Sequence, residues 1–249
     1  MYKGIDISEF QNPNMINYDR ISKNIDFVIL RAGFTGTATG STYKKDAHFD
    51  RHYEEFKKRN VPIGAYWYSC ANTRTKGIAE AQNFIKIIQG KTFDYPLYID
   101  TEDTVHQSKA TREDLTRAIE AFCLKMEEAG YYVGIYASQS WFNERLYISD
   151  LKRFDFWVAN WSTNSRPIAD YAGMWQYSSK GKIEGYTGNL DLNNAYKDYP
   201  AIMKQAKLNG YGDRKIKITA TKTFKTEKDL QMAIDDLVFL GFEYRTEPV

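Results

Sequence analysis

Three carboxylic acids follow a short apolar run near the middle of the chain, in the stretch YPLYIDTEDT at residues 95–104. Asp100 and Glu102 lie two residues apart, and on a strand such residues point to the same face with Cα atoms roughly 6.5–7 Å apart. Asp103 would face the other way and is expected to be a turn or cap residue. Crowded carboxyl groups raise one another's pKa, so that one of them can stay protonated near neutral pH and act as a general acid.

Two further strand-like segments carry an acid in the same manner: Asp6 in GIDIS and Asp191 in NLDLN. If these segments are the first and last strands of a closed barrel, they are neighbours, and all four carboxylates meet at the end where barrel enzymes place their chemistry. One such acid could simply begin a loop, but four at matching strand ends favour a catalytic pocket. Paired carboxylates beside aromatic rings suit the cleavage of a glycosidic bond, because one protonates the leaving oxygen and another supports the oxocarbenium-like transition state. The spacing leaves open whether the reaction retains or inverts configuration.

The elements that must position these acids are short apolar runs bounded by turn residues. Eight are predicted as strands: 3–8, 26–33, 62–69, 95–102, 131–138, 155–161, 172–178 and 188–193. Helical patterns separate the earlier ones, at about 46–59, 76–89 and 111–130. This alternation predicts right-handed βαβ units and a parallel sheet. Because the connectors after the sixth strand lack helical periodicity, the predicted fold class is α/β: an irregular (β/α) TIM-like barrel with helices mainly after the first five strands.

The pattern changes near residue 200, so the barrel is predicted to span 1–200. Residues 211–249 are predicted to form a small β-α-β element, whose helix begins with a capping box of Thr226 and Asp229. An element of about 35 residues is too small to be stable alone. It must dock on the barrel, pair with a second copy, or belong to a longer domain.

Composition excludes several classes of function. Aromatic residues make up 15% of the 249 residues, and many Tyr and Trp side chains suit a cleft that stacks sugar rings. The net charge of +2 includes no basic block of the kind that binds nucleic acid, and no apolar stretch is long enough to insert into a membrane. Cys70 and Cys123 are expected to be buried free thiols. His48 and His52 have a metal-capable spacing, but no third ligand is evident, so no metal and no cofactor are predicted.

The chain resembles the glycoside hydrolase family 25 lysozymes, the Chalaropsis-type muramidases of phage endolysins and bacterial autolysins. Seven segments between about residues 2 and 196 follow the family's order of strand motifs: GIDISEFQ, FVILRAG, PIGAYWYS, YIDTE, GIYAS, FWVANW and MWQYSSKGKIEGYTGNLDLN. The resemblance implies a bacteriolytic glycosidase that cleaves the β-1,4 bond between N-acetylmuramic acid and N-acetylglucosamine of peptidoglycan.

By this resemblance Glu102 is the proton donor, Asp100 assists from the same strand, and Asp6 and Asp191 match the acids of the first and closing strands. Asp100 could be a nucleophile or could orient the 2-acetamido group of the substrate, and the substrate-assisted version is favoured. Arg31 carries a charge at the end of an apolar run, which requires a partner, and it is expected to pair with the acid cluster. The main expected contacts to the glycan are Tyr66, Tyr136 and Trp175, each with a place in the barrel core as its alternative. Trp161 and Gln176 lie at corresponding strand ends and are also assigned to substrate binding.

Two other functions remain open on the sequence. A non-catalytic wall-binding protein on a barrel scaffold would not need all four acids. A chitinase-like glycosidase would carry further acids upstream on the same strand, where this chain has Pro96 and Tyr98. The N-terminus MYKGIDIS shows no signal peptide, so the protein is expected either to be made in a host cytoplasm and released, as a phage endolysin is, or to derive from a trimmed secreted precursor. The expected partner is bacterial peptidoglycan, and the C-terminal element could also form a homo-oligomer.

Overall fold

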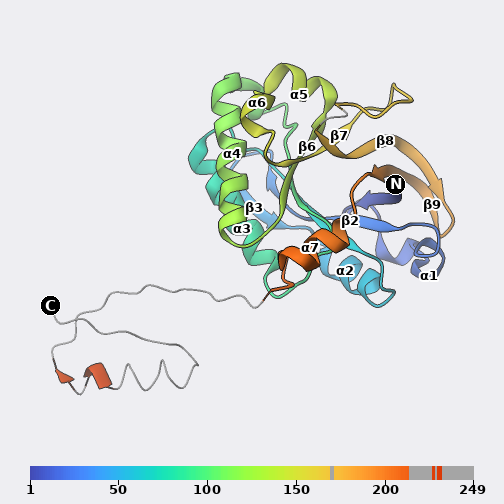
Figure 1. Ribbon diagram of the computed structural model, residues 1–249, viewed down its shortest axis with the longest axis horizontal. Helices are drawn as coiled ribbons and strands as arrows, with labels where there is room; N and C mark the ends of the chain where they lie inside the picture. Colours follow the sequence, from blue (N-terminus) through green and yellow to red (C-terminus); the bar gives the residue numbers. More distant parts are fainter. Residues whose placement is uncertain (169–170, 213–225, 228, 232–249) are drawn as a thin grey trace. The chain divides into compact units, whose positions relative to one another are not determined.

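The computed structural model describes residues 1–168, 171–212, 226–227 and 229–231. Across these residues, nine strands form one sheet with the order β1-β9-β8-β7-β6-β5-β4-β2-β3, and β1 also pairs with β2. Eight of the strands therefore close into a barrel (Figure 1), which confirms the predicted fold class. The strands are β1 (Tyr2–Ile7), β2 (Phe27–Gly36), β3 (Thr42–Lys45), β4 (Ile63–Tyr68), β5 (Leu97–Asp100), β6 (Val133–Ser138), β7 (Asp155–Ala159), β8 (Ala172–Ile183) and β9 (Tyr186–Ala195).

The sequence predicted a parallel barrel, but one strand of the barrel is antiparallel to its neighbours. Neighbouring strands from β1 through β2 and β4 to β8 pair in parallel, but β9 is antiparallel to both β8 and β1. The reason is the length of the β8–β9 connection. A parallel crossover needs a dozen or more residues, whereas only Glu184 and Gly185 separate these strands. Gly185 has a φ of 109°, which a residue with a side chain rarely adopts.

Helices lie outside the barrel strands in Figure 1. They follow the first five barrel strands, as predicted, and no helix joins β7 to β8 or β8 to β9 among the described residues. Threonine hydroxyls cap two of the longest: Thr73 accepts from the Lys76 N–H and Thr111 from the Asp114 N–H. The helices are α1 (Tyr18–Ile21), α2 (Phe49–Lys57), α3 (Arg74–Ile88), α4 (Arg112–Glu128), α5 (Gln139–Arg145), α6 (Ile148–Leu151) and α7 (Tyr199–Ala206), with 3₁₀ turns at Pro13–Met15 and Gln107–Lys109.

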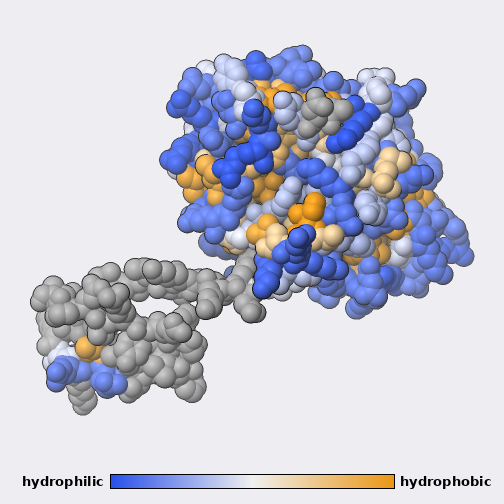
Figure 2. Space-filling model, viewed as in Figure 1, coloured by the Kyte–Doolittle hydropathy of each residue, from blue (hydrophilic) through white to orange (hydrophobic). Residues whose placement is uncertain are grey.

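The core has two parts. One fills the space between strands and helices, and the other is a cluster rich in aromatic rings inside the barrel, which includes Phe27, Tyr98 and Trp157. Glycine makes room for these rings: a Cβ on Gly134 would lie 2.4 Å from the Tyr98 ring, closer than any side chain allows. Most residues on the face shown in Figure 2 are hydrophilic, consistent with apolar burial in these two parts. Both cysteines are free and buried, as expected.

The barrel unit continues past residue 200. The buried Asn209 donates to the Tyr95 carbonyl at 2.8 Å and accepts from the Tyr132 N–H at 2.7 Å, which ties the segment after α7 to two barrel strand starts. The chain divides into two compact units, Met1–Arg214 and Lys215–Val249.

Most of the predicted β-α-β element at 211–249 lies outside the described residues. The two residues of its predicted capping box are described, and they make the expected contacts. The Asp229 N–H donates to the Thr226 hydroxyl at 3.1 Å, and that hydroxyl donates to the Asp229 carboxylate at 2.8 Å. None of the helices in the described part of the chain has the length and apolar character needed to cross a membrane.

Candidate active site

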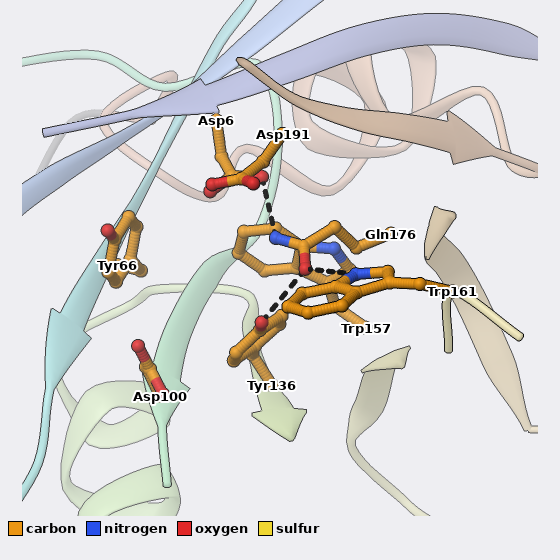
Figure 3. A pocket seen from close by; sticks show the side chains of 8 residues that line it. All are labelled: Asp6, Tyr66, Asp100, Tyr136, Trp157, Trp161, Gln176 and Asp191. Atoms are coloured by element: carbon orange, nitrogen blue, oxygen red, sulfur yellow. Dashed lines mark hydrogen bonds between the residues drawn. The ribbon is translucent and has the colours of Figure 1, made fainter. Parts of the chain in front are cut away.

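A cavity of about 230 Å³ lies at the mouth of the barrel, where the parallel strands end. Seven of its eight lining residues belong to the predicted site, and Trp157 is the addition. Figure 3 shows Asp6 and Asp191 together at one edge of this space, Tyr66 between them and Asp100, and Gln176 grouped with three aromatic rings opposite. The lining residues are Asp6, Tyr66, Asp100, Tyr136, Trp157, Trp161, Gln176 and Asp191.

Asp6 and Asp191 form the closest acid pair of the cavity. They are direct partners in the β1–β9 register, and their carboxyl groups hydrogen-bond to each other. Their adjacency was predicted, but it arises from antiparallel pairing and not from matching strand ends. Burial raises the pKa of Asp6, and the neighbouring Asp191 raises it further; burial also raises the pKa of Asp191. The pair is therefore expected to hold one proton near neutral pH.

Two side-chain amides hold Asp6 in place. Gln176 and Asn193 donate to the same Asp6 oxygen, Oδ2, at 2.9 and 2.8 Å. The Gln176 carbonyl oxygen accepts from the Tyr136 hydroxyl at 3.0 Å and from the Trp161 indole at 3.1 Å. These two aromatic donors fix the orientation of the Gln176 amide, because its oxygen must face them. Its NH₂ group must therefore face the Asp6 carboxyl.

The sequence reasoning missed two residues of this arrangement: Trp157, which lines the cavity, and Asn193, which donates to Asp6. The Trp157 indole donates to the side-chain oxygen of Asn193 at 2.8 Å, and this bond orients the Asn193 amide toward Asp6. The alternation of strand residues could have found both. In the predicted strand 155–161, Trp157 would share a face with Trp161, and in the predicted strand 188–193, Asn193 lies two residues after Asp191.

Asp100 is the last residue of β5 and points into the cavity (Figure 3). Burial raises its pKa well above the ordinary value, the charges of Glu102 and Asp6 raise it further, and Arg31 opposes the shift. Glu102 lies beyond the strand, so the strand pleat does not place it as predicted. Instead its Oε1 accepts from the Ser138 N–H at 2.7 Å, and its charge acts on both Asp100 and Tyr136. Glu102 therefore lies beside the cavity, although it is not among the lining residues.

Asp103 caps the turn after β5, as predicted, and it is also buried. Its carboxylate accepts from the backbone N–H groups of His106 and Gln107. It folds the loop after β5 back on itself and does not face the cavity-lining acids.

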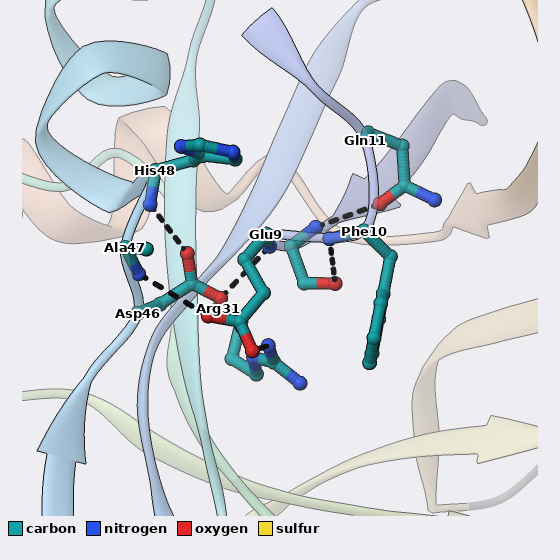
Figure 4. A network of polar contacts seen from close by, with 8 residues as sticks. Glu9, Phe10, Gln11, Arg31, Asp46, Ala47 and His48 are labelled. Carbon is teal, nitrogen blue, oxygen red and sulfur yellow. Dashed lines mark hydrogen bonds and ion pairs between the residues drawn. The ribbon is translucent and has the colours of Figure 1, made fainter.

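Arg31 has different partners from those predicted. It does not pair with the four acids but with Asp46 at 2.7 Å and Glu9 at 2.8 Å, in the network of Figure 4. Its guanidinium also lies 5.0 and 4.9 Å from the ring centroids of Phe10 and Phe34. The prediction that Arg31 needs a charged partner is confirmed. Arg31 affects the cavity through its charge, which opposes the rise in the pKa of Asp100.

Trp175 does not line the cavity, in contrast to the prediction. The residue is only 7% exposed, and its indole donates to the Asn160 backbone carbonyl at 2.8 Å. Adjacent strand residues point to opposite faces, so Gln176 in the cavity requires that Trp175 point away. Trp161, by contrast, lines the cavity and remains 59% exposed, which leaves a large apolar surface for a ligand.

Of the two histidines with a metal-capable spacing, His52 has a hydrogen-bond partner inside the fold. His52 is buried and its Nδ1 lies 2.7 Å from the Tyr18 hydroxyl, and burial lowers its pKa to about 4. In the described part of the chain, no group of three or more His, Cys, Asp or Glu side chains could hold a metal ion.

An irregular β/α barrel with several acids and aromatic walls at its mouth is the architecture of a class of glycoside hydrolases. The chain belongs to glycosyl hydrolases family 25, whose family model matches residues 5–186. It is 28% identical to the autolytic lysozyme of Clostridium acetobutylicum over 77% of this chain and 55% of that protein. This chain thus spans about half the length of that relative.

Two solved structures are similar in fold and sequence. A glycosyl hydrolase 25 of Streptococcus pneumoniae has a TM-score of 0.69 and 26% identity, covering 82% of this chain and 92% of its own. A modular autolysin of the same organism, solved with a synthetic peptidoglycan ligand, has a TM-score of 0.66 and 28% identity, covering 78% of this chain and 46% of its own.

Proposed function

We propose that the protein is a lysozyme, an N-acetylmuramidase that hydrolyses the β-1,4 bond between N-acetylmuramic acid and N-acetylglucosamine in bacterial peptidoglycan. The observation that carries the proposal is the mouth of the barrel, where three acids line an aromatic-walled cavity with Glu102 beside it. Membership of family 25 supports the same activity, as does the peptidoglycan ligand of the related autolysin.

In this proposal Glu102 protonates the glycosidic oxygen as the sugar bond breaks. The Ser138 N–H holds one of its carboxyl oxygens, and the other carries the proton to the leaving group. Trp161 and Tyr136 provide apolar surface for the sugar rings beside the acids.

Asp100 faces the anomeric centre from the end of β5, two residues before Glu102. Because burial favours its neutral form, Asp100 would be a weak nucleophile. This favours the version in which the substrate's own acetamido oxygen attacks the anomeric carbon, while Asp100 hydrogen-bonds to the acetamido group. The Asp6–Asp191 pair completes the polar wall, and the charge of Asp6 adds to the effects of burial and of Glu102 in raising the pKa of Asp100.

Digestion of purified peptidoglycan with the wild-type protein and Glu102→Gln tests the activity and the proton donor together. Mass spectrometry should find N-acetylmuramic acid at the new reducing ends, with no new amino groups. Glu102→Gln should fold normally and lower the rate by at least about a hundredfold, the lower range for loss of a general acid. Glu113→Gln, an exposed acid on α4, is the matched control and should keep full activity.

Two results would contradict the proposal. Reducing ends that are mainly N-acetylglucosamine would show a different bond specificity, and freed amino groups would show an amidase. A folded Glu102→Gln protein with near-normal clearance of cell walls would contradict the assignment of the proton donor.

For the remainder of the chain, we propose that the C-terminal element at 211–249 targets the enzyme to cell walls or joins two copies of it. The capping contacts of Thr226 and Asp229 support a helix start there. The protein would then act at the wall of a bacterium, as an endolysin or autolysin does.

A further inference from the structure

The loop after β5 holds Glu102 between two residues that bond to one buried amide. Gln107 is 0% exposed, and its Oε1 accepts from the Thr101 hydroxyl at 3.2 Å and from the Asp103 N–H at 3.0 Å. The residues immediately before and after Glu102 are therefore bound to the same oxygen atom. The backbone that carries Glu102 is fixed on both sides.

The other end of this amide binds a different loop. Gln107 Nε2 donates to the Ser69 hydroxyl at 3.2 Å and to the Ala71 carbonyl at 3.1 Å, just after β4. Both donors and both acceptor positions of the amide are thus occupied. This arrangement also fixes its orientation, because a flipped amide would face the Asp103 N–H with an N–H group.

Ser69 is itself anchored to a helix. Its hydroxyl donates to the buried carboxyl of Glu80 on α3, which also accepts from the Thr35 hydroxyl at 2.7 Å and the Cys70 N–H at 2.9 Å. A continuous chain of hydrogen bonds therefore runs from α3 through Ser69 and Gln107 to the loop that carries Glu102. Buried networks with every member satisfied are rigid.

We propose that Gln107 is a positioning residue for the proton donor, because it fixes the backbone from which Glu102 reaches the glycosidic oxygen. The inference rests on the proposed function. The Ser138 N–H holds the carboxyl end of Glu102 and Gln107 holds its backbone, so that both ends of the side chain are defined. A shift of about 1 Å in a catalytic group can lower a rate by about a hundredfold.

The test replaces Gln107 with methionine, an apolar side chain of similar size that keeps the volume and removes both ends of the amide. Gln107→Met should lower kcat on peptidoglycan about tenfold or more. KM should stay within about twofold, because the cavity-lining residues are unchanged. Thr101→Val removes one of the bonds and should lower kcat by a smaller factor, roughly threefold.

Thr116→Val is the matched control for both variants. Thr116 is a buried threonine on α4 whose hydroxyl donates to the Arg112 carbonyl at 2.7 Å and accepts from the Tyr147 N–H at 3.0 Å. The Thr116→Val variant loses comparable buried hydrogen bonds, and none of them connects to Glu102. Its kcat should equal that of the wild type.

A double-mutant cycle separates positioning from a general structural role. If Gln107 acts through Glu102, adding Gln107→Met to Glu102→Gln should cause no further loss of rate. Losses that multiply, or a kcat of Gln107→Met within about twofold of the wild type, would overturn the role of Gln107. If Gln107→Met fails to fold, Thr101→Val is carried through the same cycle.

The outcome for Gln107 is distinct from the outcome for the proposed function. A wild-type protein that releases no N-acetylmuramic acid ends, or an active Glu102→Gln variant, would overturn the proposed function and this inference with it. An active wild type and an inactive Glu102→Gln variant, combined with a normal Gln107→Met variant, would overturn the inference alone.

Discussion

Replacing Glu80 with glutamine should remove a pH dependence of stability that the wild-type protein carries. The Glu80 carboxyl on α3 is 1% exposed, and burial raises its pKa from 4.5 to about 7 in spite of three hydrogen bonds from Ser69, Thr35 and Cys70. Glutamine has the same shape and resembles the protonated carboxyl, so the variant keeps the neutral form at every pH.

The magnitude follows from the difference between the two pKa values. The unfolded chain releases this proton near pH 4.5, whereas the folded protein keeps it until about pH 7. The folded state therefore binds more protons between these values, and the free energy of unfolding falls as the pH rises through this window. At 1.36 kcal/mol per pH unit, about 2–3 kcal/mol should be lost between pH 5 and pH 8 through Glu80 alone.

Urea unfolding at pH 5 and pH 8 measures this loss for the wild type and for Glu80→Gln. Other buried acids with raised pKa values, such as Asp100 and Asp155, will lower the stability of both proteins at high pH. The difference between the two losses isolates Glu80 and should be about 2–3 kcal/mol. Glu113→Gln controls for removal of one exposed carboxyl. Equal pH dependence in the wild type and Glu80→Gln would refute a neutral, buried Glu80.

Three further predictions concern ligand contacts, metal and the C-terminal element. Trp161→Ala should raise KM several-fold with little change in stability, whereas Trp175→Ala should lower stability by about 3 kcal/mol and leave KM unchanged; the reverse pattern would contradict the site. Activity should survive EDTA, because the proposed chemistry uses carboxyl groups; loss on chelation with recovery on adding Zn²⁺ would contradict it. Truncation after Arg214 should weaken sedimentation with cell walls but not hydrolysis of soluble muropeptides, and unchanged wall binding with an unchanged oligomeric state would refute a role for the element.

The parts of the fold that local patterns determine were predictable. The helix α4 shows this: Thr111 caps it, and its apolar residues at helical spacing are buried. The strand β3 was missed because its residues, TYKK, are mostly exposed and polar and show no apolar alternation. The direction of β9 was wrong because a short connection without helical periodicity was not recognised as a hairpin turn.

The site was predictable in its residue types and less so in its directions. Asp6, Asp100 and Asp191 were identified because acids at the ends of apolar strands need a reason to be there. Trp175 and Gln176, in contrast, were both assigned to the cavity although they are adjacent on one strand. Alternation allows only one of them to face inward, and the hydrogen bond from Gln176 to Asp6 shows which.

What the sequence could not supply is the identity of partners that the fold brings together over long distances. Asp6 bonds to Asn193, 187 residues away, only because β1 and β9 close the barrel. Arg31 needed a carboxylate, and the sequence could not show that loops outside the acid cluster provide it in Glu9 and Asp46. Pairing of this kind depends on loop geometry, whereas burial of a charge on a strand depends on local pattern. The same distinction explains why the sequence could name Glu102 as an acid but could not reveal that Gln107 fixes the backbone on either side of it.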